Sequence, residues 1–140
     1  MDTGCTDSGI QSKVMVHGLE HAGIASPDPE KLAQWYVERL GFAVCYHNAN
    51  SKTTFVKAPN GSMLEIILAN ATPRATQTFK DAGIRHLAIA VDDFDAVCGR
   101  LKAEGVQFLT EPENNKGNRV VFFADPDGNY LHLIQREKPL

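Results

Sequence analysis

The most constraining feature of this sequence is that it contains the same pattern twice. At a spacing of 65 residues, segments 20–28 and 85–93 share four residues: His21/His86, Ile24/Ile89, Ala25/Ala90 and Asp28/Asp93. At a spacing of 67 residues, segments 59–67 and 126–134 share four more: Pro59/Pro126, Gly61/Gly128, Leu64/Leu131 and Ile67/Ile134. The two matches occur in the same order along the chain. A unit of about 60 residues is therefore present twice, and both copies are expected to fold in the same way.

The first copy is predicted to fold as a strand, a helix and three further strands. Residues 18–25 alternate as a strand does, and Asp28 followed by Pro29 is typical of a helix start. Apolar residues then recur every four positions until Gly41, which favours a helix end. The strand-like runs that follow occupy residues 42–46, 53–57 and 63–68, with an Asn-Gly turn before the last.

The second copy repeats this plan. Residues 84–91 are expected to form a strand, Asp92 or Asp93 to cap a helix, and Gly105 to end it. The helix has an apolar face made of Phe94, Val97, Cys98 and Leu101. Strands are predicted at 106–109, 119–124 and 129–135, with an Asp-Gly turn before the last.

The repeats divide the chain into a polar leader (residues 1–15) and a single domain (residues 16–140). Module one (17–69) and module two (84–136) are joined by a linker (70–83) with little apolar content. One βαβββ module is too small to bury both faces of its sheet. We therefore expect an α+β fold in which the paired modules form a curved, mixed eight-stranded sheet with helices outside and a concave face free to hold a ligand.

Composition excludes several classes of partner. A chain of 140 residues that is 43% hydrophobic suits one compact domain. Its formal net charge of −3 argues against a nucleic-acid groove or an anionic membrane surface as the main partner. No apolar run approaches the ~18 residues of a membrane span, and the first residues lack the pattern of a signal peptide. We expect a cytoplasmic protein that binds a small molecule, and neither nucleic acid nor a membrane.

Strand alternation places four polar residues at equivalent points of the two modules, because side chains two residues apart share a face. In the first strand of each module, His21 and His86 each share a face with small residues. In the last strand of each module, Glu65 and His132 occupy aligned positions. Symmetry would bring all four side chains toward the axis of the predicted sheet.

Three imidazoles and one carboxylate, from His21, Glu65, His86 and His132, suit a borderline divalent cation such as Zn²⁺, Ni²⁺, Mn²⁺ or Fe²⁺. A single strand histidine is more often an ordinary structural residue. The shared register favours a metal site, because a glutamate inside the apolar run 63–68 would be costly to bury without a partner.

Together, these motifs resemble the vicinal oxygen chelate superfamily, which includes glyoxalase I, extradiol dioxygenases and bleomycin-binding proteins. The resemblance covers residues 17–136. It is carried by His-Ala-Gly-Ile-Ala from residue 21, Arg-His-Leu-Ala-Ile-Ala-Val-Asp from residue 85, and Phe-Ala-Asp-Pro-Asp-Gly-Asn-Tyr-Leu-His-Leu from residue 123. It implies a glyoxalase-like domain and, in its enzymes, a divalent metal held by the residues that match the four named above. The chain departs from the family at His132, where many relatives carry a carboxylate.

The resemblance implies an enzyme, specifically a glyoxalase-like lyase or isomerase. Its substrate would be a small α-hydroxycarbonyl compound or thioester that chelates the metal through two oxygens and reacts through an enolate-like intermediate. Glu65 would be the catalytic proton carrier, and Tyr130 and Lys57 are candidate substrate contacts. The alternatives are an iron(II) dioxygenase and a metal-free small-molecule binding or resistance protein. The cleft would form within one chain or across a homodimer, and open sheet edges favour a dimer.

Overall fold

The structure, a computed structural model, describes residues 15–140, so the leader predicted for residues 1–15 lies almost entirely outside it. Module one consists of β1 (His21–Ser26), α2 (Pro29–Leu40), β2 (Ala43–Asn48), β3 (Thr53–Lys57) and β4 (Met63–Leu68). Asp28 caps α2 by accepting a hydrogen bond from the Lys31 N–H, and Gly41 ends the helix with a left-handed backbone (φ 74°). The helix start and end therefore lie where the sequence predicts them.

Module two consists of β5 (Leu87–Ala90), α3 (Phe94–Ala103), β6 (Gln107–Phe108), β7 (Glu113–Asn115), β8 (Asn118–Ala124) and β9 (Tyr130–Gln135). Asp93, rather than Asp92, caps α3. Strand β5 is shorter than the predicted strand 84–91, so His86 lies just before its first residue.

Strand β7 was not predicted. It pairs with β8 across the two-residue turn Lys116-Gly117. Both turn residues have positive φ, at 54° and 87°, as in the type I′ turns that are favoured in two-residue β-hairpin loops.

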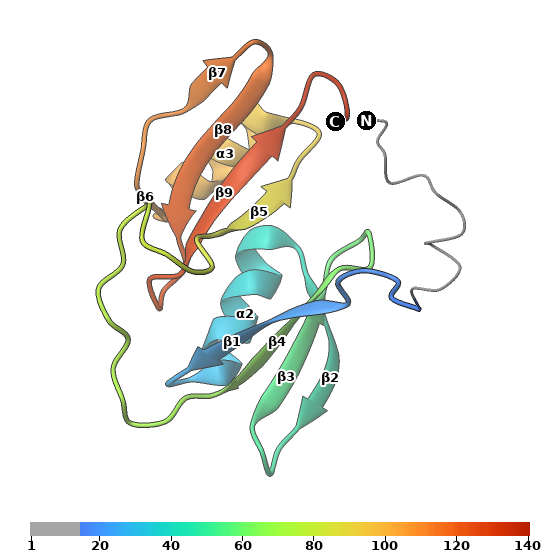
Figure 1. Cartoon of the computed structure of the whole chain (residues 1–140), viewed down its shortest axis with the longest axis vertical. Coiled ribbons are helices and arrows are strands. Elements are labelled where there is room, and N and C mark those ends of the chain that lie inside the picture. The colour runs from blue at the N-terminus through green and yellow to red at the C-terminus, as the bar shows by residue number, and fades with distance from the viewer. Residues whose placement is uncertain (1–14) are drawn as a thin grey trace.

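The modules have the same strand topology (Figure 1). The strand order is β1-β4-β3-β2 in the first sheet and β5-β9-β8-β6 in the second, with β7 beside β8. Strand β1 runs parallel to β4, and β5 runs parallel to β9. Gly23 lies opposite Glu65, and Ala88 lies opposite His132. The predicted α+β architecture of paired βαβββ modules is confirmed.

The predicted curved, mixed eight-stranded sheet is divided between the modules, because the strands of residues 15–140 form two mixed sheets, one of four and one of five strands. In residues 15–140, β1 pairs only with β4 and β5 pairs only with β9, so both strands keep a free edge. The modules meet through α2 instead. The Trp35 ring of α2 lies 6.5 Å from that of Phe123 in β8.

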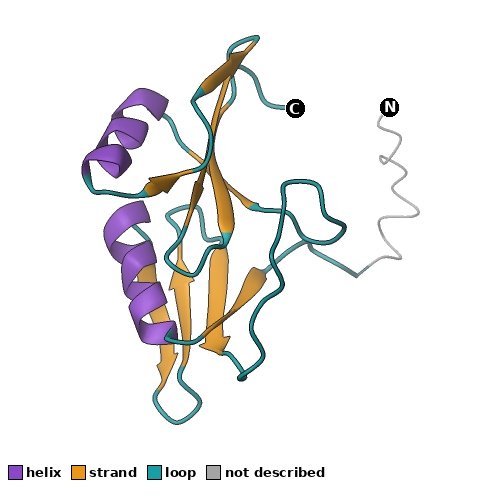
Figure 2. Cartoon of the chain, turned by 90° about the vertical axis from the view of Figure 1, so that its left-hand side faces the viewer, coloured by secondary structure: helices purple, strands orange, loops and turns teal. Residues whose placement is uncertain are grey.

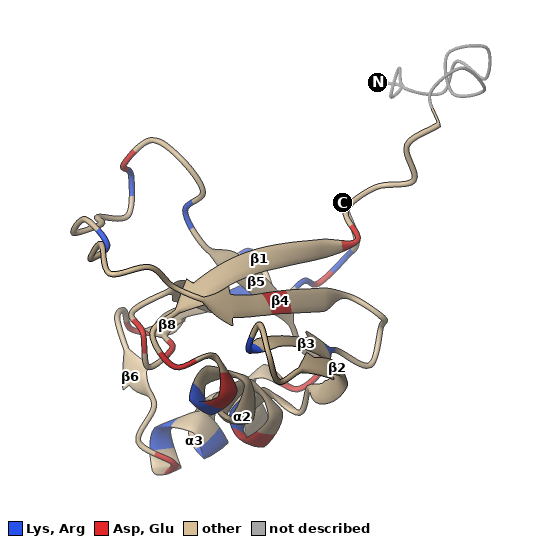
Figure 3. Cartoon of the chain, turned by 90° about the horizontal axis from the view of Figure 1, so that it is seen from below, with Lys and Arg blue, Asp and Glu red and all other residues tan. Residues whose placement is uncertain are grey.

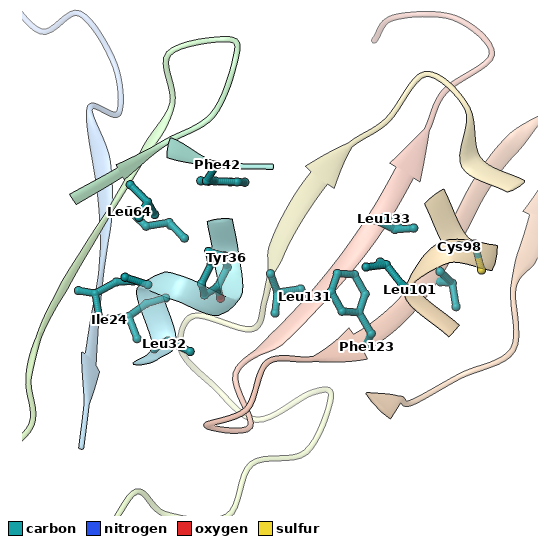
Figure 4. Close-up of a cluster of buried hydrophobic side chains, with 14 of the residues drawn as sticks. Ile24, Leu32, Tyr36, Phe42, Leu64, Cys98, Leu101, Phe123, Leu131 and Leu133 are labelled. Carbon is teal, nitrogen blue, oxygen red and sulfur yellow. The ribbon is translucent and has the colours of Figure 1, made fainter. Parts of the chain in front are cut away.

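One hydrophobic core extends through both modules. Figure 4 shows Tyr36 of α2 between Ile24 of the first sheet and Leu131 of the second. Helices α2 and α3 lie on the same side of the molecule (Figure 2), so each sheet has one covered face and one open face. In the described part of the chain, no helix is long and apolar enough to cross a membrane.

A buried hydrogen-bond network around Asp125 also joins the modules. The Tyr36 hydroxyl of α2 donates to Oδ2 of Asp125 at 2.7 Å, and Nδ2 of Asn129 donates to the same oxygen at 2.7 Å. The backbone N–H groups of Asp127 and Asn129 donate to Oδ1, each at 3.0 Å. Burial raises the pKa of Tyr36, so its hydroxyl keeps the proton that it donates. The Asp-Pro-Asp-Gly turn is thus tied to the helix of the other module.

Candidate functional site

His21 and Glu65 lie together on the open face of the first sheet. Nε2 of His21 is 3.8 Å from Oε1 of Glu65, and each side chain is about one-third exposed. Glu65 is the only charged residue of β4, which lies beside β1 (Figure 3). On the other side of the imidazole, Nδ1 of His21 lies 2.8 Å from Oε1 of Glu20. A proton held between Nδ1 and Glu20 leaves the Nε2 lone pair free on the side of Glu65.

His86 and His132 lie together in module two, with their ring centroids 4.4 Å apart. Phe122 packs against both rings, at 5.3 Å from His86 and 4.9 Å from His132. The Nδ1 atoms of both histidines are buried, and neither has a hydrogen-bond partner among the described residues. Buried polar atoms without partners are rare in folded proteins and call for a specific explanation.

Both histidines of module two favour the neutral imidazole. Burial and the positive charges of His86, Arg85 and Arg136 lower the pKa of His132 from 6.5 to about 4. Burial and the charge of Arg85 also lower the pKa of His86. A neutral imidazole is the form whose ring nitrogen binds a metal ion.

The lowered pKa of His132 predicts that the metal-free protein loses stability in mild acid. In the unfolded chain His132 takes up a proton as the pH falls below about 6.5, whereas in the folded chain its imidazole stays neutral down to about pH 4. The free energy of unfolding should therefore decrease between these pH values. Urea denaturation in the presence of a chelator measures this decrease. It should be smaller in His132→Gln than in wild type or in the control His47→Gln, and identical pH profiles in all three would contradict the prediction.

The two pairs do not meet within one chain. Residues 15–140 contain no group of three or more histidine, cysteine, aspartate or glutamate side chains placed to hold a metal ion. The neighbours of the pairs on the same strand faces are small and exposed: Gly23, Ala25, Ala88 and Ala90. Each module thus presents one pair of the four predicted ligands.

The two candidate substrate contacts lie in different surroundings. Tyr130 donates its hydroxyl hydrogen bond to the carbonyl of Gln77 at 2.8 Å, and its ring lies 5.0 Å from that of Phe79. Lys57 lies at the end of β3, opposite Met63, and is exposed. Tyr130 therefore holds the linker against the second sheet, while Lys57 is free to reach outward.

Sequence reasoning missed four residues beside the pairs. Glu20 and Arg85 each precede a paired histidine and occupy aligned positions of the repeat, a signal that was available in the sequence. Phe122 lies directly opposite His132 in the strand register. Phe79 belongs to the linker, which folds back so that this ring lies 5.1 Å from Phe122. No local pattern predicts that path.

Comparison with known proteins points to the same architecture. The sequence model of the Glyoxalase/Bleomycin resistance protein/Dioxygenase superfamily matches residues 18–133. A Vibrio cholerae protein described as "Probable lactoylglutathione lyase" is 28% identical over 128 residues, which cover 87% of this chain and 93% of that protein.

Two solved structures extend the likeness to three dimensions. A glyoxalase family protein from Enterococcus faecalis is similar with a TM-score of 0.70 at 26% identity, covering 87% of this chain and 100% of that chain. TnmS3, an antibiotic binding protein from Streptomyces sp. CB03234, gives 0.67 at 29% identity, covering 89% and 99%. Since the family match spans most of the chain and its fold is the one described above, this protein belongs to the Glyoxalase/Bleomycin resistance protein/Dioxygenase superfamily.

Proposed function

We propose that this protein is a metal-dependent vicinal oxygen chelate enzyme, a lyase or isomerase acting on a small α-hydroxycarbonyl or thioester substrate. The observation that carries the proposal is the equivalent placement of two ligand pairs. The two sheets have the same register: His21 lies two residues before the partner of Glu65, and His86, just before β5, lies two residues before the partner of His132.

The donor set fits a borderline divalent cation. Three imidazoles and one carboxylate match the ligands that zinc, nickel, manganese and iron accept. The neutral, partly buried imidazoles of His86 and His132, each with a ring nitrogen that has no partner among residues 15–140, fit the same role. A metal bound by these residues would supply Lewis acidity toward a carbonyl oxygen.

In this proposal the site is completed by a second copy of the chain, since the pairs stay apart within one chain. The free edges of β1 and β5 support such an assembly, because unpaired strand edges are readily covered by another strand. Exposed apolar side chains of β4, Ile67 and Leu68, support it as well. A homodimer would combine His21 and Glu65 of one copy with His86 and His132 of the other, twice.

Glu65 would be the residue that moves the proton. It is the only carboxylate of the four proposed ligands, and one-third exposure lets its Oε atoms reach a substrate carbon. Glu65 would take the proton from the carbon next to the chelated carbonyl and return it to a neighbouring position. Glu20 would hold His21 in one orientation and tautomer during this transfer.

The test is the metal content of protein purified without chelators or an affinity tag, with size measured alongside. We expect about one transition metal per chain in a dimer. Glu65→Ala and His86→Ala should each weaken metal affinity by about 100-fold. Changing a residue that only supports a ligand already costs about 10- to 100-fold, so loss of a ligand itself should reach at least the upper end of that range. His47→Ala is the matched control, because His47 bonds Thr54 within module one. No metal after reconstitution with zinc, nickel, manganese or iron would overturn the proposal.

The same metal analysis distinguishes the proposed function from two alternatives. Iron in the site, with activity that depends on oxygen, would favour a dioxygenase. A metal-free protein would favour small-molecule binding, as in the antibiotic binding protein TnmS3 to which the chain is similar. The specific observation in favour of binding is the aromatic surface of Phe79, Phe122 and Tyr130 beside the histidines of module two.

A further inference from the structure

The residue before each paired histidine has opposite charge in the two modules. Glu20 precedes His21, and Arg85 precedes His86, at aligned positions of the repeat. Glu20 lies against the imidazole of its own neighbour at 2.8 Å. Arg85 does something different, because its guanidinium turns toward the rings that surround His86 and His132.

Three contacts fix the Arg85 side chain. Its Nε–H donates a hydrogen bond to the carbonyl of Phe79. Its guanidinium carbon lies 5.2 Å from the ring centroid of Phe122 and 5.9 Å from that of Phe79. Such cation–π contacts orient the planar guanidinium against the rings. Since Phe122 also packs against His86 and His132, the charge is held next to this histidine pair.

No acidic side chain in the described part of the chain neutralises the charge of Arg85. Among residues 15–140, Arg85 takes part in no ion pair, and its Nη atoms donate no hydrogen bond. Arg85 is exposed to solvent, so these donors are accessible. A guanidinium that is oriented at Nε and free at its Nη atoms is suited to bind a carboxylate through two parallel hydrogen bonds.

We propose that Arg85 binds the carboxylate of the ligand, and that Phe79 and Phe122 pack against the apolar part next to that carboxylate. Arg85 is thus a specificity-determining residue, which selects anionic ligands and directs their charged end toward module two. The position of the ligand's other end, over the histidine pair, rests on the proposed function. Module one offers Glu20 and Glu65 at its own pair and would repel the same charge.

The test uses phenylacetate and its neutral counterpart phenylacetamide as probes. Binding to the full chain is followed by NMR through the backbone amides of Phe79 and Phe122, once as purified and once with EDTA. We expect phenylacetate to bind in both conditions, and Arg85→Gln to weaken it by about 10-fold or more. Arg85→Lys should recover part of the loss. The matched control is Lys102→Gln. Lys102 lies in α3, and its Nζ is 5.4 Å from the ring centroid of Phe108 in β6, so this variant removes a cation from a different cation–π contact of module two.

Three results would overturn the inference. The first is equal binding of phenylacetate and phenylacetamide by the wild type. The second is phenylacetate binding that needs metal and is unchanged in Arg85→Gln; this would assign the carboxylate to the metal and leave the proposed function intact. The third is a dimer that dissociates in both Arg85→Gln and Glu20→Gln, which would assign Arg85 to an ion pair between copies. If Arg85→Gln weakens phenylacetate binding in EDTA and the protein binds no metal under any condition, the proposed function is refuted and the inference about Arg85 stands.

Discussion

Replacing Phe123 by alanine is expected to lower the free energy of unfolding by about 4 kcal/mol, the usual cost of deleting a buried phenylalanine ring. Phe123 is completely buried in β8. Its ring lies 6.5 Å from that of Trp35 in α2 and 6.1 Å from that of Phe108 in β6. The truncation therefore leaves a cavity where module one and module two meet. Urea denaturation followed by circular dichroism measures the loss.

Phe55→Ala is the matched control, because Phe55 is also a strand phenylalanine but lies on the open face of the first sheet. Its ring contacts those of His21 and Tyr46, at 5.2 and 5.9 Å, and it is only partly buried. We expect a loss of about 1 kcal/mol there. If both variants lost the same stability, Phe123 would not occupy the core between the modules.

Replacing Asp125 by alanine is expected to cost about 3 kcal/mol of unfolding free energy. The carboxylate accepts four hydrogen bonds and is 3% exposed. Without it, the Tyr36 hydroxyl and the Asn129 amide are left buried without an acceptor, and each such group costs about 1–3 kcal/mol. Urea denaturation again gives the measurement.

Tyr36→Phe measures the contribution of the one hydrogen bond of this network that joins the two modules. It removes one donor and leaves the other three in place, so we expect a smaller loss of about 1.5 kcal/mol. The double variant should lose less than the sum of the two single losses, since both changes break the same bond. Strict additivity would show that Tyr36 and Asp125 act independently, contrary to the 2.7 Å bond between them.

Local signals in the sequence predict most of the elements because the signals and the structure share a physical cause. Asp28 and Gly41 mark the limits of α2 since they satisfy the end groups of a helix in any context. Strands β3 and β4 alternate between a buried and an open face, and their bounds agree with the prediction. Strand β7 was missed because its three residues, Glu113–Asn115, are all exposed and have no apolar alternation.

The arrangement of the two sheets could not be predicted, because it depends on contacts between modules. The repeat places His21, Glu65, His86 and His132 at equivalent points, but repeat symmetry does not say how far apart the modules lie. That distance follows from the packing of α2 against β8, through Trp35 and Phe123. The side chains around the pairs escaped prediction for the same reason, since Phe79 reaches Phe122 only through the path of the linker.

The core that runs through both modules distinguishes the unit that repeats in the sequence from the unit that folds. A single copy of the repeat would expose one side of Tyr36 or of Leu131, which are fully buried in the whole chain. Neither copy holds enough of that core for independent stability. The repeated segment is therefore a unit of sequence and not a unit of folding. The cooperative unit is the pair of modules, so the two sheets should melt in one transition although none of the strands described in residues 15–140 pairs across them.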